Sequence, residues 1–125
     1  MIVKNVTITV KDDKASLSDK IILYQNDKGI DIYFTLSGFN YKVRENGLAG
    51  ALVDGRLMKP SGIVSVVSSM SIVETNKIKF TIDSTMTDEL GEVGTHTLQI
   101  RLYYDSTKKH RVTLPPITFE VKEEL

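Results

Sequence analysis

The two histidines are the side chains that titrate closest to neutral pH, so they are the first candidates for a general base or a metal ligand. His96 lies in a stretch where apolar and polar residues alternate, and His110 follows the two lysines at 108 and 109. A metal centre would need both imidazoles to converge with carboxylates, and their spacing does not predict this. We interpret both as structural histidines, whose ring nitrogens are hydrogen-bonded within the fold or exposed to solvent at its rim.

Residues 50–57 (GALVDGRL) place two glycines at the separation found in phosphate-binding loops. Arg56 stands where a lysine would contact the phosphates, and Leu57 stands where a hydroxyl would hold magnesium. No amphipathic helix follows the stretch. We therefore predict a strand with turn glycines here, without a nucleotide site.

The acidic residues lack the alternating oxygen ligands, central glycine and final glutamate of a calcium loop. The scattered acidic residues are Asp12, Asp13, Asp27, Asp31, Asp83, Asp88 and Glu89. The chain has no cysteine, which excludes thiolate zinc sites, disulfides and a cysteine nucleophile. A Gly-x-Ser-x-Gly motif is also missing. Paired-carboxylate hydrolysis depends on proximity in space and stays open. The sequence predicts no catalytic, cofactor-binding or metal-binding residues and no enzyme, and a small enzyme that sets His96 or His110 against a carboxylate is the remaining catalytic alternative.

Sixteen basic residues balance sixteen acidic ones, so the formal net charge is zero. Nucleic-acid binders usually carry a net basic field, because phosphate contacts dominate their affinity. The basic run at residues 108–111 is interpreted as a solvated hairpin tip. Apolar runs fall far short of the roughly 20 residues that span a bilayer, and the first ten residues lack the apolar core of a signal peptide. We predict neither nucleic acid nor membrane as a partner.

The clearest periodicity lies at residues 95–104 (THTLQIRLYY), where the period of two predicts a half-buried strand. Its inward face is expected to comprise His96, Leu98, Ile100, Leu102 and Tyr104. Residues 105–109 have the length of a hairpin loop. Pro115 and Pro116 cannot donate ladder hydrogen bonds, so strand pairing should break there before alternation resumes at residues 117–121.

Further strands are expected where β-branched and alternating apolar residues recur between turn signals. They cover residues 6–10, 21–25, 30–36, 48–53, 63–67 and 78–82, with turns at 26–29, 59–62 and 74–76. Polar loops are expected at 11–20 and 37–47, and one short helical turn at most at 84–90. This pattern predicts an all-β fold: an antiparallel sandwich of about eight strands, immunoglobulin-like or jelly-roll-like, in a single domain over residues 1–125. Phe34, Phe80, Leu98, Ile100 and Phe119 should be buried.

Several segments of this sequence occur in the same order as similar segments in a known protein family. The segments are IILYQNDKGIDIYFTL (21–36), ALVDGRLMKPSGIV (51–64), KIKFTID (77–83), TDELGEVGTHTLQIRLYY (87–104) and VTLPPITFEVKE (112–123). Together they resemble the N-terminal domain of upper baseplate proteins (BppU-like) of tailed phages that infect Gram-positive bacteria. His96 stands where that family has an aromatic residue after Gly94 and Thr95, and the strand assignment is unaffected.

The resemblance implies a non-enzymatic structural protein of the virion tail baseplate, made in the bacterial cytoplasm and requiring no cofactor. Its expected partners are the distal tail hub protein and, through a C-terminal region beyond this sequence, the receptor-binding protein, with further copies of itself in the virion. The chain would then be an excised docking domain or a short stand-alone version. The loops 11–20 and 37–47 are the first candidates for contacts. The alternative from another class is a carbohydrate-binding β-sandwich, for which Tyr33, Tyr41 and Tyr103 would be the exposed aromatics.

Overall fold

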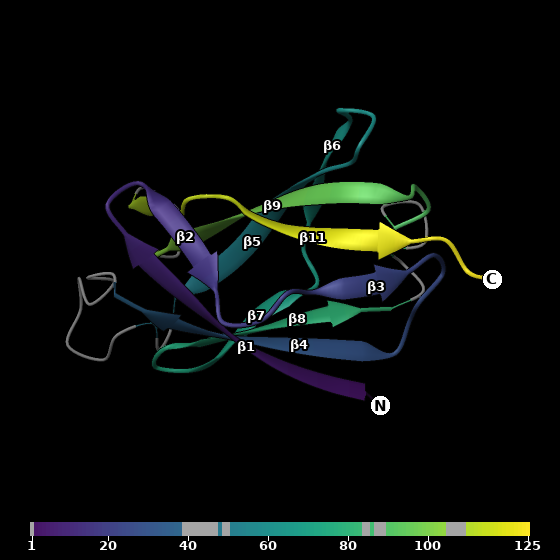
Figure 1. Ribbon diagram of the computed structural model, residues 1–125. Helices are drawn as coiled ribbons and strands as arrows, with labels where there is room; N and C mark the ends of the chain where they lie inside the picture. The colour runs from purple at the N-terminus through teal and green to yellow at the C-terminus, as the bar shows by residue number, and fades with distance from the viewer. Residues whose placement is uncertain (1, 39–47, 49–50, 84–85, 87–89, 105–109) are drawn as a thin grey trace.

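The computed structural model describes residues 2–38, 48, 51–83, 86, 90–104 and 110–125. Two β-sheets pack face to face (Figure 1), which confirms the predicted all-β sandwich. The first sheet has the order β2-β1-β4-β8-β7, and the second has the order β3-β11-β9-β5-β6, with β10 also paired to β9. The strands are β1 (Ile2–Lys11), β2 (Lys14–Leu17), β3 (Ile22–Tyr24), β4 (Ile30–Ser37), β5 (Leu52–Met58), β6 (Val64–Val67), β7 (Met70–Glu74), β8 (Lys77–Ile82), β9 (Gly94–Tyr103), β10 (Arg111–Thr113) and β11 (Ile117–Lys122).

The described part of the chain holds eleven strands instead of about eight, and the sheets are not purely antiparallel. Strand β1 runs parallel to β4, and β3 runs parallel to β11. The chain forms the β1–β2 hairpin, crosses to the second sheet as β3 and returns to the first as β4, so β4 lies beside β1 in the same direction. The prediction missed this because side-chain alternation has a period of two in either direction.

Two edge strands lie where the sequence predicted none. Strand β2 falls inside the predicted polar loop 11–20, and β7 lies between the predicted strands 63–67 and 78–82. Both are short and partly exposed, so neither carries a clear apolar face. The predicted strand 48–53 was shifted, because β5 begins at Leu52 after a turn in which the Ala51 N–H donates to the Leu48 carbonyl at 2.9 Å.

Three predicted features fall largely outside the described residues: the loop 37–47 beyond Gly38, the hairpin loop 105–109 and most of the helical turn 84–90. At the end of that last segment, the Leu90 N–H donates to the Met86 carbonyl at 3.1 Å. The turn at 26–29 has the positive φ values expected there, 66° at Asn26 and 75° at Gly29. Pro115 and Pro116 separate β10 from β11, as predicted, and both strands pair with β9.

The core lies between the two sheets and contains all five side chains predicted to be buried. Phe34 of β4 stacks on Phe80 of β8, with 6.5 Å between the ring centroids. Gly55 of β5 faces this core, because an added Cβ would lie 3.0 Å from Leu98 and 3.1 Å from the Met70 sulfur. The strand predicted for this glycine stretch is confirmed for residues 52–57, but Gly55 lies within that strand and is not the turn glycine that was predicted, and Gly50 lies outside the described residues.

Candidate functional site

The two histidines lie too far apart to form one site. His96 is fully buried in β9, where its ring stacks on Phe119 at 5.3 Å and its Nδ1 lies 3.3 Å from the Gly94 carbonyl oxygen. The carbonyl of the exposed His110 accepts a hydrogen bond from the Tyr104 N–H. Tyr104 follows His96 by eight residues along an extended chain, so it lies roughly 26 Å from His96. His110, which is hydrogen-bonded to Tyr104, is therefore at the far end of β9 from His96. The prediction of separate, structurally accommodated histidines agrees with this arrangement.

Several of the candidate carboxylates have structural partners. Asp31 is buried and accepts a hydrogen bond from the Thr81 hydroxyl at 3.0 Å. Asp27 accepts one from the Tyr24 N–H at 2.9 Å, which closes the turn after β3. Within the described residues, no group of three or more histidine, aspartate or glutamate side chains is arranged to hold a metal ion.

The two of these tyrosines that the structure describes, Tyr33 and Tyr103, do not form the flat exposed platform that the carbohydrate interpretation requires. Tyr103 is buried and Tyr33 is half-buried, whereas Tyr41 lies outside the described residues. The expectation that Tyr103 is exposed was wrong, because its ring lies in a polar cluster at the end of β9.

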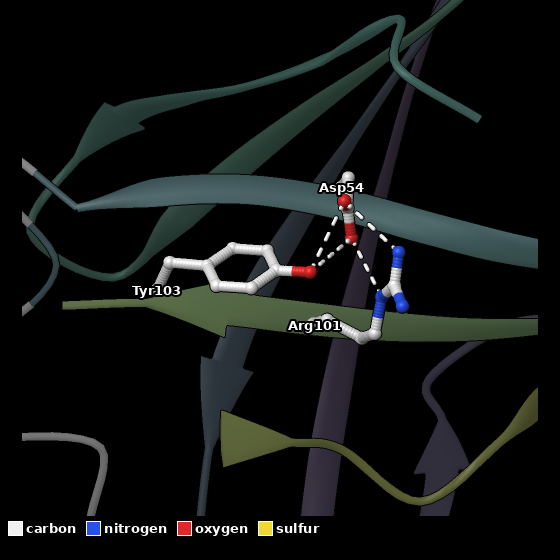
Figure 2. A network of polar contacts seen from close by, with 3 residues as sticks. All are labelled: Asp54, Arg101 and Tyr103. Carbon is white, nitrogen blue, oxygen red and sulfur yellow. Dashed lines mark hydrogen bonds and ion pairs between the residues drawn. The ribbon is translucent and has the colours of Figure 1, made fainter. Parts of the chain in front are cut away.

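That cluster joins Asp54 of β5 to Arg101 and Tyr103 of β9 (Figure 2). Asp54 and Arg101 are direct partners in the antiparallel register of the two strands. The Arg101 Nε donates to one carboxylate oxygen at 2.8 Å and an Nη donates to the other at 3.0 Å. The Tyr103 hydroxyl lies 3.2 and 3.4 Å from the same two oxygens. The arrangement is the bidentate geometry in which arginine binds carboxylate most strongly.

Burial makes this ion pair unusual for the outer face of a sheet. Arg101 retains 8% of its accessible surface, and its guanidinium carbon lies 6.0 Å from the centre of the Tyr103 ring. The hydrogen bonds to Asp54 raise the pKa of Arg101 above its ordinary value, and burial offsets part of that increase. The guanidinium therefore stays charged and bound, which is suited to fixing β5 against β9 and not to transferring protons.

Sequence reasoning missed this cluster. Asp54 and Arg101 are 47 residues apart, and strand register alone makes them neighbours. One signal was present: a carboxylate within an apolar stretch of one strand, and a cation flanked by Ile100 and Leu102 in another.

A groove of about 940 Å³ adjoins the cluster. It lies between the first half of β5 and strand β7, because β6 pairs with β5 only over Gly55–Met58 and the chain then crosses to the other sheet. Asp54 and Tyr103 line one side of the groove. The other described residues that line it are Ala51, Leu52, Val53, Val66, Ser68, Met70, Ser71, Ile72, Val73, Glu74 and Thr75.

The β5–β6 hairpin beside this groove exposes a set of apolar side chains and projects from the sandwich at the top of Figure 1. Met58, Ile63, Val64 and Val66 retain 42%, 58%, 52% and 61% of their accessible surface. The turn of the hairpin is held by Glu92, whose carboxylate accepts hydrogen bonds from the N–H and hydroxyl of Ser61. The protein is therefore a β-sandwich with two surface features: the apolar β5–β6 hairpin, whose turn is held by Glu92, and the groove between β5 and β7.

The fold defines the class of protein: a two-sheet β-sandwich of mixed strand direction. No family model matches the chain, and no curated protein matches it. Among solved structures, it is similar to the N-terminal domain of phage TP901-1 ORF48, with a TM-score of 0.64, 16% sequence identity and 100% coverage of both chains. At this identity the likeness shows a shared fold. The described residues include no helix with the length and apolar character of a membrane span.

Proposed function

We propose that this chain is a structural component of a phage or prophage tail baseplate, in which it acts as a docking domain that links the tail hub to receptor-binding proteins. The observation that carries the proposal is the match of the whole fold to the N-terminal domain of a phage protein. The order of the sequence segments, which resembles that of the N-terminal domain of upper baseplate proteins, supports the same assignment.

The physical requirements of such a docking domain agree with what is observed. A baseplate component must keep its shape under load and present wide surfaces to its neighbours. The bidentate Asp54–Arg101 pair joins β5 to β9, and the Glu92–Ser61 contacts brace the β5–β6 hairpin. Strand edges and a groove beside β7 supply surfaces on which another protein can add a strand.

In this proposal the chain works in the virion tail after synthesis in the bacterial cytoplasm. It binds the distal tail hub protein directly, and it carries the receptor-binding protein through a region C-terminal to residue 125. Copies of the chain surround the hub as a homo-oligomer, and the function needs no catalytic residue, cofactor, nucleic acid or membrane.

The test is binding to the distal tail hub protein encoded in the same phage or prophage gene cluster. The two proteins are co-expressed, purified by a tag on the hub protein and examined by size-exclusion chromatography with light scattering. A stable complex of defined stoichiometry is expected, and charge reversal at exposed Asp13 in the segment 11–20 is expected to weaken it. The proposal fails if no complex forms and the neighbouring genes encode no tail proteins.

A further inference from the structure

Strand β6 is an edge strand without the usual protection against pairing. Among the described strands it pairs with β5 alone, and its sequence, Val-Ser-Val-Val, contains neither charge nor proline. Natural edge strands are normally blunted by charged residues, proline, bulges or very short length. An edge that lacks the first three of these devices is a template on which another strand can add.

The other edges in the described structure carry such devices. Strand β2 has Lys14, and β7 has Glu74 together with a register irregularity next to it. Strands β3 and β10 span three residues each, and β10 begins with Arg111. Strand β1 before Ile8 also lacks a partner on the side of β2, but it carries the charged residue Lys4. The Lys4 ammonium donates a hydrogen bond to the Ile22 carbonyl at 3.2 Å. The β6 edge therefore stands out by comparison with the rest of the fold.

The side chains beside this edge favour association. Val64 and Val66 point outward from β6, and Met58 of β5 lies directly opposite Val64 in the register of the hairpin. More than half of the surface of each valine is exposed. Contiguous exposed apolar surface of this kind typically marks a contact with another protein.

The edge is complementary to itself. In an antiparallel pairing of two β6 strands centred on Ser65, each Val64 faces the other copy's Val66, and the two serines face one another. The cross-strand pairs at this seam are then valine with valine and serine with serine, so no like charges meet. Arg56 lies beside Val66 of its own copy, and Val66 separates it from the other copy's Val64. The two Arg56 residues therefore do not face one another. The formal net charge of zero also removes any overall repulsion between copies.

We infer that the occupant of the β6 edge is a second copy of this chain, paired antiparallel about Ser65 so that the second sheet continues across a two-fold axis. The inference deepens the proposed function by assigning a self-contact to its oligomer. Because this register pairs only Val64–Val66 of each β6 strand, the isolated dimer is expected to be weak. In an assembly, the high local concentration of copies would strengthen the same contact.

The register can be tested by cross-linking, because the native chain has no cysteine. In the inferred dimer the two Ser65 Cβ atoms are about 4.5–5.5 Å apart, so Ser65→Cys should form a disulfide-linked dimer under mild oxidation. Val66→Cys should cross-link more slowly, since two copies of residue 66 are diagonal neighbours at about 7–8 Å. Thr118→Cys is the matched control, because Thr118 is exposed on central strand β11 of the same sheet.

Sedimentation velocity over a range of concentrations measures the reversible association. The native chain should show a concentration-dependent dimer, and Val66→Lys should raise the dissociation constant by roughly tenfold or more, which corresponds to about 1.4 kcal/mol. Val66 is exposed, so circular dichroism and urea unfolding should show that this variant remains folded. The inference is overturned if the native chain stays monomeric and Ser65→Cys cross-links no faster than Thr118→Cys. A dimer that persists in Val66→Lys, or a β6 edge that binds the hub protein and not itself, overturns it as well. A monomer that still binds the hub protein refutes the self-contact and leaves the proposed function intact.

Discussion

Replacing Asp54 by alanine would leave the guanidinium of Arg101 buried without its counter-ion. The pair buries both partners, with 10% of the Arg101 side chain and 18% of the Asp54 side chain exposed. Arginine cannot neutralise itself by losing a proton, since its pKa is high and is raised further here. The variant must therefore open the structure locally or retain an uncompensated charge.

The expected cost follows from the geometry of the pair. Two charges about 4 Å apart interact by about 4 kcal/mol at an effective dielectric constant of 20. Removing one partner of a buried pair typically costs about 3–5 kcal/mol, and we expect Asp54→Ala to fall in this range. Arg101→Met should cost less, about 1–3 kcal/mol, because the Tyr103 hydroxyl still lies within hydrogen-bond distance of the carboxylate. The double variant Asp54→Leu/Arg101→Met should be about 2 kcal/mol more stable than Asp54→Ala, because it removes both charges.

The assay is urea unfolding followed by far-UV circular dichroism, since the chain has no tryptophan. The native chain, Asp54→Ala, Arg101→Met and the double variant are compared by their midpoints and slopes. An unchanged slope assigns the shift in midpoint to stability and not to a more compact unfolded state. Thr118→Ala, at an exposed position of β11 in the same sheet, is the control.

A cost below about 1 kcal/mol for Asp54→Ala, the value typical of exposed ion pairs, would refute the reasoning. A double variant that is less stable than Asp54→Ala would also refute it, because the penalty would then not come from an unpaired buried charge.

Two further predictions concern packing and backbone geometry, both measured by urea unfolding. Phe80→Ala should cost about 3–5 kcal/mol because it leaves a cavity in the core, whereas Thr118→Ala on the exposed face should stay within about 0.5 kcal/mol of the native chain; equal costs would contradict the facing of these strands. Gly38→Ala should be more destabilising than Gly29→Ala. Both glycines have φ near 75°, but an added Cβ at Gly38 would lie 2.7 Å from the Val10 carbonyl oxygen and one at Gly29 meets nothing within 4 Å. Similar losses for the two variants would show that backbone strain alone is responsible.

The local alternation of side chains was sufficient to predict the sandwich and its central residues. Phe34, Phe80 and Phe119 each occupy the apolar phase of a long strand, and each is buried. Turns that need positive φ were also visible, because Asn26 and Gly29 tolerate that conformation. These features depend on residues that are neighbours in the sequence.

Strands that lack a clear apolar face could not be predicted in this way, because only their pairing with distant strands defines them. Strand β7 has one buried residue, Met70, and the four-residue edge strand β2 has none, with only Ala15 and Leu17 half-buried. Their assignment depends on backbone hydrogen bonds to β8 and β1. The parallel pairing of β1 with β4 was likewise invisible, because it depends on the path of the chain through the other sheet.

For the candidate surfaces, too, some features follow from the sequence and others only from the tertiary structure. The sequence alone determined that Val64 and Val66 share one face of an uncharged strand and that no cysteine chemistry is available, because both facts are local or compositional. The tertiary structure decided that this strand lies at an edge, that β6 stops short of Leu52 and leaves a groove, and that Asp54 meets Arg101. Edges, grooves and ion pairs between strands are set by the order and register in which segments pair, and that information resides in contacts between residues far apart in the chain.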